Sequence, residues 1–385
     1  MFNYLSNAEL IFGNDTSVNA HDQIIDILGK NIFVITDKGL TELGLFEPVV
    51  NKLKKNSNIK IFNDVESDPS KNTLLEAYNK ASSFESSGVL GFGGGSSLDV
   101  AKLVSLLLVS NQNIETIWGV NNAIGPRIPL ALIPTTAGTG SEVTPISIIT
   151  MDDKAKKGVS SKLILPDLAI LDPLLTINLP PNITASTGID AMVHAIEAYT
   201  STNPNNNPIS KMLSIEALKF LGSSIKTAVF EGHNINARSN MLFGSMLAGK
   251  AFANSPVAAV HALAYPIGGL FKISHGLSNS LVLPSVLRFN SINEGTKKNY
   301  AYLAPYIFKD LDNSKSDDEV CNNFIDCLET LTKEIKLPYR LRDLEIPEEA
   351  CHLMAAEAMK QTRLLVNNPR KIEESDAFNI YKSVW

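Results

Sequence analysis

The sequence predicts an α/β fold with a parallel sheet in its first half and an all-helical fold in its second half. Short apolar runs alternate with longer amphipathic stretches up to about residue 180, which is typical of a parallel sheet covered by helices on both faces. After Pro180 and Pro181 the strand-like runs stop and helical spacing dominates. The chain's 385 residues are enough for two domains, so we expect one at 1–180 and another at 181–385.

Four apolar runs in the first half are predicted to be buried strands. Each is short and is closed by Gly, Pro or Asp, residues that favour turns. Two stretches between them, 73–84 and 98–108, have apolar residues at helical spacing. The predicted strands cover residues 32–36, 89–92, 128–133 and 168–171.

The second half is predicted to consist of helices, four of which have clear apolar periodicity. An Asn- and Pro-rich segment, 202–208, separates the first two and is expected to be an exposed turn. The predicted helices cover residues 187–199, 210–229, 237–252 and 321–334.

The composition favours a cytoplasmic protein. A net charge of −6 argues against a general binder of nucleic-acid backbones. The three cysteines form no CxxC pair and are typical of free thiols in a reducing compartment. The first residues lack the basic and apolar segments of a signal peptide, and no apolar run approaches the roughly 20 residues that span a bilayer. We therefore expect neither a nucleic-acid nor a membrane partner.

A run of three glycines follows the second predicted strand and precedes a predicted helix. Gly93, Gly94, Gly95 and Ser96 form this loop. Glycines let a ligand approach the backbone closely, and the free N–H groups at a helix start favour a phosphate. The loop matches neither GxGxxG nor the P-loop motif, so a plain tight turn capped by a serine is the alternative.

A second polar loop, 134–142, follows the third predicted strand. Its hydroxyl groups on Thr135, Thr136 and Thr139 suit a phosphate or a ribose, whereas a polar turn with a helix cap at Ser141 is the alternative. Ligands of open α/β sheets bind at the carboxyl ends of the strands. Two such loops at that edge therefore favour a dinucleotide-binding domain.

Asp37 closes the first predicted strand. An acid at this position can accept hydrogen bonds from a ribose 2′-OH and would repel a 2′-phosphate, which favours NAD over NADP. A helix N-cap is the alternative interpretation of the same residue.

One aspartate and three histidines form a candidate metal site. Asp190 and His194 are four residues apart in a predicted helix, so both side chains project from one face. His261 and His275 lie in apolar segments, where an imidazole needs a partner. One carboxylate and three imidazoles suit a divalent metal, although separate core histidines bonded to backbone carbonyls would also satisfy the pattern.

Glu197 lies one turn beyond His194 in the same predicted helix. It is either a hydrogen-bond partner behind a metal ligand or a glutamate on the helix surface.

Together these segments resemble the iron-containing alcohol dehydrogenase family, the group III metal-dependent dehydrogenases. The matching pieces occur in family order along nearly the whole chain. They are Gly93-Gly94-Gly95-Ser96 with Asp99 and Lys102, segment 134–144, Leu171-Asp172-Pro173, segment 187–197, His261-Ala262-Leu263-Ala264 and Ile273-Ser274-His275-Gly276.

The resemblance implies a dehydroquinate synthase-like architecture, with an α/β dinucleotide-binding domain followed by an all-α metal- and substrate-binding domain. The implied reaction is a reversible hydride transfer between a small alcohol or diol and the corresponding aldehyde or ketone. The implied cofactors are NAD, rather than NADP, and Fe²⁺, with Zn²⁺ or another divalent metal as alternatives. A homodimer or a larger homo-oligomer is also implied.

The resemblance also assigns roles to residues of this chain. It implies that Asp190, His194, His261 and His275 hold the metal, and that loops 93–96 and 135–139 bind the cofactor together with Asp37, Asp99 and Lys157. The adjacent Lys156 is the alternative for the lysine. His275 and Tyr265 are the candidate catalytic residues.

Two positions depart from the family pattern. Many members have Asn where this chain has Asp68, before Pro69, and this change is expected to weaken or reshape a cofactor contact. Some members have a histidine that relays a proton where this chain has Tyr265. The tyrosine either passes a proton or only shapes the pocket.

Alternative functions remain open at this point. A metal- and NAD-dependent lyase of the dehydroquinate synthase type would need a basic pocket, whereas few basic residues, among them Lys250 and Lys272, flank the histidines. A hydroxy-acid dehydrogenase or reductase of the same family is a second alternative, although no residue stands out as a carboxylate clamp. A non-enzymatic NAD-binding or filament-forming protein is a third.

Overall fold

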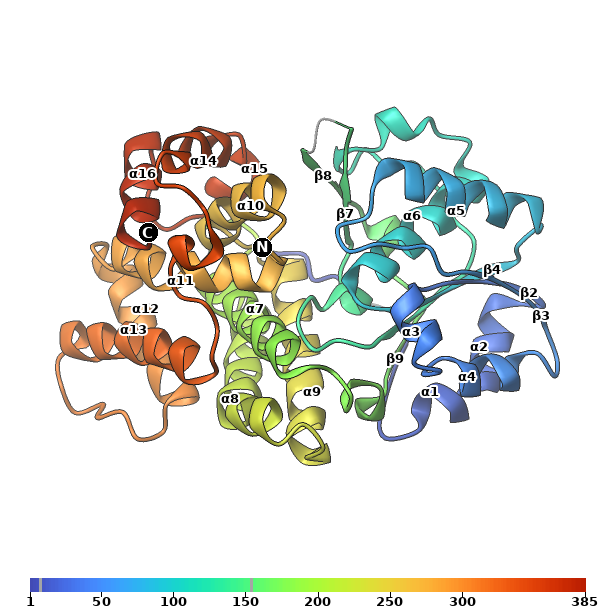
Figure 1. Cartoon of the computed structure of the whole chain (residues 1–385), viewed down its shortest axis with the longest axis horizontal. Coiled ribbons are helices and arrows are strands. Elements are labelled where there is room, and N and C mark those ends of the chain that lie inside the picture. Colours follow the sequence, from blue (N-terminus) through green and yellow to red (C-terminus); the bar gives the residue numbers. More distant parts are fainter. Residues whose placement is uncertain (7–8, 153–154) are drawn as a thin grey trace. The chain divides into compact units, whose positions relative to one another are not determined.

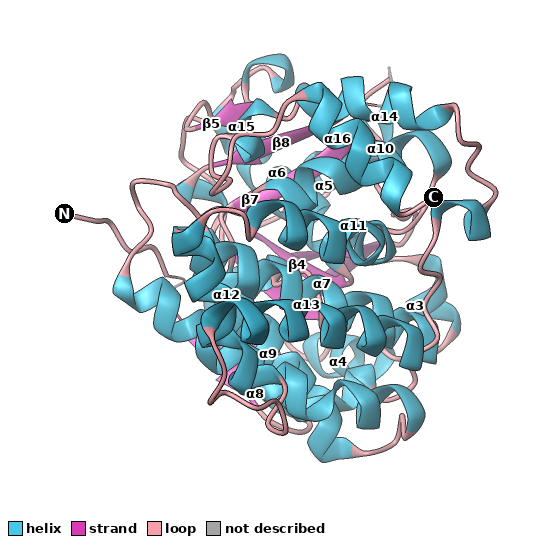
Figure 2. Ribbon diagram, turned by 90° about the vertical axis from the view of Figure 1, so that its left-hand side faces the viewer, coloured by secondary structure: helices cyan, strands magenta, loops and turns pink. Residues whose placement is uncertain are grey.

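A computed structural model describes all residues except 7, 8, 153 and 154. The chain divides into two compact units. We call residues Leu5–Ile177 the α/β unit and residues Met1–Tyr4 with Asn178–Trp385 the helical unit (Figure 1). The predicted fold class is confirmed, because the α/β unit contains a parallel sheet and the described part of the helical unit forms helices without strands (Figure 2). No helix among the described residues is long and apolar enough to cross a membrane.

A six-stranded parallel sheet forms the centre of the α/β unit, with strand order β1-β9-β6-β4-β2-β3. The four predicted strands are confirmed as β2, β4, β6 and β9. The two missed strands, β1 and β3, lie at the edges, where most of their residues are only partly buried and Lys60 interrupts the apolar run of β3. The six strands are β1 Glu9–Phe12, β2 Asn31–Ile35, β3 Asn58–Phe62, β4 Gly88–Gly93, β6 Leu130–Pro134 and β9 Leu168–Leu171.

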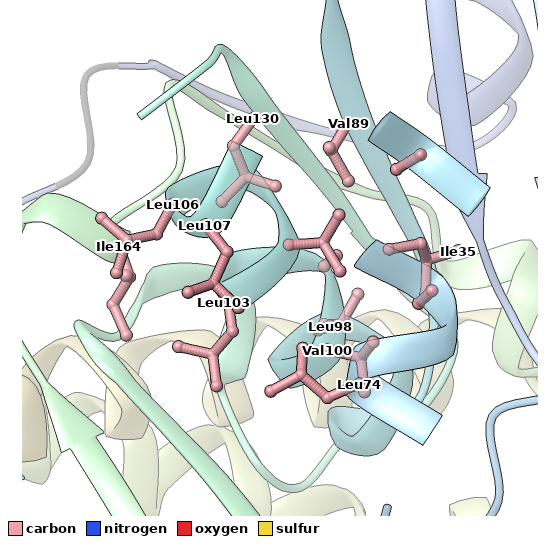
Figure 3. Packing of buried hydrophobic residues seen from close by; sticks show 14 of the residues in the cluster. Ile35, Leu74, Val89, Leu98, Val100, Leu103, Leu106, Leu107, Leu130 and Ile164 are labelled. Atoms are coloured by element: carbon pink, nitrogen blue, oxygen red, sulfur yellow. The ribbon is translucent and has the colours of Figure 1, made fainter. Parts of the chain in front are cut away.

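Both faces of the sheet are covered by helices. Successive side chains of a strand point to opposite faces, so β2 contributes to two apolar clusters. Phe33 and Ile35 of β2 pack in one apolar cluster with residues of α5 and α6. Figure 3 shows Ile35 with Leu74 of α5 and Leu98 of α6 in this cluster. Ile32 and Val34 pack in a second cluster with residues of α2 and α4. The helices of this unit are α1 Thr16–Asn19, α2 His21–Leu28, α3 Lys38–Glu42, α4 Glu47–Leu53, α5 Lys71–Ser83 and α6 Gly95–Ser110.

A small second sheet in the α/β unit, with order β5-β8-β7, was not expected from the sequence. Strands β7 and β8 are antiparallel and half polar, so they lack the continuous apolar runs of the central strands. The strands are β5 Gly119–Val120, β7 Ile146–Thr150 and β8 Lys156–Ser160, and short 3₁₀ helices lie at Ile114–Thr116, Ser141–Val143, Lys162–Ile164 and Pro173–Thr176.

In the helical unit, α7 packs against α8, α9 and α11, and every residue from 188 to 200 is buried. The four helices predicted in this half are confirmed as α7, α8, α9 and α13, each extended by a few residues at one or both ends. The helices are α7 Pro181–Thr200, α8 Pro208–Phe230, α9 Ile235–Asn254, α10 Ala259–Phe271, α11 His275–Asn290, α12 Glu294–Ile307, α13 Asp317–Glu334, α14 Ala350–Met359, α15 Thr362–Leu365 and α16 Glu374–Ser383, with a 3₁₀ turn at Leu341–Leu344.

Candidate active site

The four side chains predicted to form a metal site come together in the helical unit. Asp190, His194, His261 and His275 each offer one ligand atom, and these atoms all lie within 4.8 Å of one another. The first two come from α7, His261 from α10 and His275 from α11. One carboxylate oxygen and three imidazole nitrogens at this spacing form a donor set that suits a single divalent ion.

Helix geometry places each of these side chains. Asp190 and His194 share a face of α7 because they are one turn apart. His275 is the first residue of α11, where the following Gly276 allows close packing on α7. A Cβ atom at Gly276 would lie 2.3 Å from the backbone oxygen of Ser186, so only glycine permits this approach.

The imidazole rings lie close to Asp190 and to one another. Oδ1 of Asp190 lies 3.6 Å from Nε2 of His275 and 3.9 Å from Nε2 of His261. The rings of His194 and His261 stack, with their centroids 4.7 Å apart. The ring of His194 also stacks on Phe252, with a centroid distance of 4.3 Å. The three rings are therefore held by packing as well as by their helices.

Burial and charge fit a metal ion at this position. Nε2 of His261 is buried and has no hydrogen-bond partner among the described residues, an arrangement that costs roughly 1–3 kcal/mol unless a ligand compensates it. Asp190 and Glu197 are both buried; His261 lies within ion-pair distance of both carboxylates, and His275 lies within ion-pair distance of Asp190. The two buried carboxylates together carry the charge that one divalent cation would balance.

The pKa of Asp190 shows the same electrostatic pattern. Burial alone would raise this pKa, but the nearby imidazoles of His194, His275 and His261, together with the amide of Asn279, outweigh burial and hold it below its usual value. The carboxylate is therefore stabilised in the ionised form that a metal ligand needs.

Glu197 is a buried partner of a candidate ligand and not a helix-surface residue. Its Oε2 accepts a hydrogen bond of 2.6 Å from Nδ1 of His261. Its two oxygens also accept from the backbone N–H groups of Ala258 and Val260. Of the two interpretations left open by the sequence, the structure supports the hydrogen-bond partner.

Asn279 is a second supporting residue, which the sequence analysis missed. It lies one turn after His275 on α11 and is fully buried. Its Nδ2 donates a 2.6 Å hydrogen bond to Oδ1 of Asp190 and lies 3.3 Å from Nε2 of His275. The only sequence signal was its spacing of four residues from His275.

The candidate catalytic residues His275 and Tyr265 are neighbours. Their ring centroids are 5.8 Å apart, and Tyr265 follows His261 by one turn on α10. The side chain of His275 is 30% exposed, whereas those of His261 and Asp190 are only 3% and 2% exposed. The cluster is therefore open to solvent on the side of His275 and closed on the side of α7.

In the α/β unit, the predicted glycine loop joins β4 to α6. Gly93 has a φ of +154°, and a Cβ atom there would lie 2.8 Å from Oγ of Ser97. The N-cap of α6 is Gly94, which has no side chain to accept hydrogen bonds from the first turn. These backbone N–H groups are available to an anion such as a phosphate. The serine-capped turn is thus not the arrangement observed.

The second predicted loop lies directly beside the glycine loop. Thr135 donates its backbone N–H to the oxygen of Gly93, and a Cβ atom at Gly95 would lie 2.8 Å from Cγ2 of Thr139. Thr136 is the nearest neighbour of a Cβ atom at Gly94, at 3.6 Å. The structure therefore brings together the two loops for which the sequence predicts cofactor binding.

Asp99 and Lys102 join these loops from the inside of the fold. Both Asp99 oxygens are occupied, by the hydroxyl of Ser141 at 2.6 Å and the N–H of Ile148 at 2.8 Å. Lys102 is fully buried and donates to Ser141 and to the oxygen of Ile146. Burial raises the pKa of Asp99 and lowers that of Lys102 to about 8, against the effect of their mutual attraction.

The remaining predicted cofactor residues are Asp37, which follows β2, and Lys157, which lies on β8. Oδ1 of Asp37 accepts from the N–H of Leu40 and caps α3, which is the alternative that its position suggested. Lys157 is exposed on β8, whereas the side chain of Lys156 is only 8% exposed and pairs with Asp68 at 2.6 Å. The N–H of Asp68 donates to Oγ of Ser96, so the ion pair of Lys156 is linked to the glycine loop through Asp68.

Comparison with known families covers both units. The family model described as iron-containing alcohol dehydrogenase matches residues 7–173, and the model for the C-terminal part of the Fe-containing alcohol dehydrogenase family matches residues 184–385. The chain belongs to the iron-containing alcohol dehydrogenase family. The predicted family is confirmed, and with it the prediction of an alcohol dehydrogenase, an oxidoreductase that acts on CH–OH groups.

Relatives of this alcohol dehydrogenase align along nearly its whole length. Long-chain-alcohol dehydrogenase 1 of Geobacillus thermodenitrificans is 38% identical over 92% of this chain and 90% of its own. The NAD-dependent methanol dehydrogenase of Bacillus methanolicus is 30% identical over 100% of both chains. The crystal structure of a 1,3-propanediol oxidoreductase, 30% identical, superimposes over 100% of both chains with a TM-score of 0.95.

Proposed function

We propose that this chain is an NAD-linked alcohol dehydrogenase with a divalent metal held by Asp190, His194, His261 and His275. Fe²⁺ is the first candidate for this metal. The observation that carries the proposal is the cluster of four ligand atoms within 4.8 Å, one of which, Nε2 of His261, is buried without a hydrogen-bond partner among the described residues. When bound, the metal supplies a Lewis acid that stabilises charge on the substrate oxygen, and NAD accepts or donates the hydride.

The residues of the helical unit would orient the substrate for this chemistry. His275 is the most exposed of the three ligands whose side-chain exposures are compared above, so the substrate oxygen is expected to arrive on its side of the cluster. Tyr265 lies beside His275 and is the candidate to shape the pocket or to pass a proton. Phe252 packs against His194 and supplies an apolar surface.

The loops of the α/β unit would bind the cofactor. The N–H groups at the start of α6 are proposed to hold the pyrophosphate, with Gly93, Gly94 and Gly95 keeping the backbone accessible. Thr135, Thr136 and Thr139 line the adjacent loop. Asp37 is proposed to favour NAD over NADP, and the name of the NAD-dependent methanol dehydrogenase relative supports the same preference.

Two of the expected cofactor residues are assigned modified roles. Asp99 is proposed to act indirectly, since its oxygens already accept hydrogen bonds from Ser141 of the second loop and from the N–H of Ile148 on β7. Lys156 is proposed as the basic residue near the cofactor phosphates in preference to Lys157, because its ion pair with Asp68 lies next to Ser96.

The substrate is proposed to be a small alcohol or diol. Relatives of this chain are named for long-chain alcohols, methanol and 1,3-propanediol, which share a CH–OH group but differ in length and polarity. We further propose that the enzyme works in the cytoplasm as a homodimer or a larger homo-oligomer.

A metal analysis combined with an activity screen tests the proposal. The purified enzyme should contain or bind one divalent ion per chain and oxidise short primary alcohols with NAD. The H261A variant should lose both metal and alcohol oxidation while NAD binding persists, because NAD is bound by the other unit. The H352A variant is the matched control, since His352 is exposed and stacks on Phe378. Full turnover of the wild-type enzyme after thorough chelation would contradict the metal role.

A further inference from the structure

The helix that carries His261 begins without a capping side chain of its own. The residue before α10 is Ala258, which cannot accept a hydrogen bond through its side chain. The first N–H groups of a helix need acceptors, and an uncapped buried helix start is costly. In this protein the acceptors come from a different helix.

Glu197 of α7 supplies them. Its Oε1 accepts from the N–H of Val260 at 2.6 Å, and its Oε2 accepts from the N–H of Ala258 at 3.0 Å. A carboxylate at a helix N-terminus is also favoured by the helix dipole. Glu197 thus ties the start of α10 to α7, the helix that carries Asp190 and His194.

The same carboxylate determines which nitrogen of His261 faces the candidate metal site. Oε2 of Glu197 accepts a 2.6 Å hydrogen bond from Nδ1 of His261, so the proton of the ring is on Nδ1. Nε2 then presents its lone pair, and this is the atom that points toward Asp190 without a hydrogen-bond partner among the described residues. One side chain therefore controls the position of the helix, the ring and the tautomer.

We propose that Glu197 is a positioning residue for the metal, which presents Nε2 of His261 to the ion by binding Nδ1 and capping α10. This inference rests on the proposed metal site. Removing such an outer partner of a metal-ligating histidine typically weakens metal binding by about 10–100-fold.

The E197Q variant separates positioning from simple packing. Its side chain has nearly the same shape, but a single amide oxygen replaces two carboxylate oxygens that receive three N–H donors. At least one donor loses its acceptor. The matched control is N234A, which removes the N-cap of α9 in the same unit without touching any of the four candidate ligands.

The experiment measures the dissociation constant of Zn²⁺ by competition with a chromophoric chelator, and the visible spectrum of the Co²⁺-loaded proteins. We expect metal binding by E197Q to be about 10–100-fold weaker than wild type, with an altered Co²⁺ spectrum, whereas N234A keeps both wild-type values even where its melting temperature falls. A purely structural role for Glu197 would lower stability without changing either metal readout.

A folded E197Q with wild-type Zn²⁺ affinity and Co²⁺ spectrum would overturn the inference. If E197Q fails to fold, the E197D variant is used instead, because Asp keeps the negative charge but has a side chain shorter by one methylene group. Wild-type Zn²⁺ affinity and Co²⁺ spectrum in E197D would then overturn the inference. A wild-type enzyme that binds neither ion would instead refute the proposed metal site itself.

Discussion

Asn279 donates a 2.6 Å hydrogen bond to Oδ1 of Asp190, and so joins α11 to α7 at the centre of the candidate metal site. Both residues are buried, and the amide is one of the groups that lower the pKa of the aspartate. Asp190 therefore depends on a neutral donor from another helix, in addition to the imidazoles, to remain an ionised ligand in a buried position.

Replacing Asn279 should weaken the metal site while the fold persists. The N279L variant keeps the volume of the side chain but removes the donor, so the affinity for Zn²⁺ should fall by about tenfold or more. The N290L variant is the control, because Asn290 is also buried on α11 but bonds to Asn368. Equal losses of metal affinity in the two variants would show that the effect comes from general damage to α11.

Gly276 is expected to be essential for the packing that brings His275 beside Asp190. In G276A the new methyl group would meet the backbone of Ser186, which cannot move aside as a flexible side chain can. The start of α11 should shift away from α7, with loss of metal binding and a lower melting temperature.

The matched control for this variant is G295A. Gly295 is the second residue of α12, as Gly276 is of α11, but its Cβ would meet only Oδ1 of Asn293, at 3.3 Å. Metal titration by calorimetry and thermal unfolding of both variants check the prediction. Retention of metal affinity by G276A would contradict it.

The sequence was sufficient to predict the central strands and the helices α7, α8, α9 and α13, which have local signals such as continuous apolar runs and helical spacing. It did not predict α10, α11, α12 or α14. The spacing of Asp190 and His194 suggested two candidate ligands on one helix face, and the family resemblance implied the set of four. The contacts of Glu197 and Asn279 depend on which helices meet, so their spacing along the chain could only suggest them. The edge strands were missed because burial on one side leaves a mixed pattern, as in β3 with Lys60. Whether Lys156 or Lys157 lies next to Asp68 could not be predicted from the sequence, because it depends on the register in which β8 pairs with β7.

Because Lys102 is buried, its contribution to the free energy of unfolding should increase with pH. Burial lowers its pKa to about 8 in the folded protein, against attraction by Asp99 and Glu142, while the unfolded chain has a lysine pKa near 10.4. Between these values the unfolded state holds a proton that the folded state has released, so this group's contribution to stability rises with pH. Below pH 8 both states are protonated and the contribution is constant.

The K102M variant lacks this titration. The free energy of unfolding of the wild type minus that of K102M should therefore increase from pH 7.5 to pH 9.5, by the order of 1 kcal/mol. Calorimetric unfolding at both pH values measures the difference, with K219M, at an exposed lysine, as the control. A difference that stays constant or decreases would show that Lys102 keeps its proton in the fold.

Asp68 is expected to limit the affinity for NAD, since it already neutralises Lys156 beside the glycine loop. Its backbone has a φ of +55°, which Asn also tolerates, so D68N should preserve the turn and its N–H bond to Ser96. The variant leaves the mostly buried ammonium of Lys156 without its counter-charge. A cofactor phosphate would replace that charge.

We therefore expect D68N to melt at a lower temperature than the wild type without NAD and to bind NAD several-fold more tightly, with a steeper loss of affinity as salt increases. Fluorescence titration with NAD at two salt concentrations measures this. The control is D64N, which removes the same charge from an exposed residue paired with Lys38 and Lys80. If D64N gained as much affinity as D68N, the gain would come from the net charge of the unit and not from release of Lys156. If D68N bound NAD no more tightly than the wild type, the phosphates would not lie within reach of this lysine.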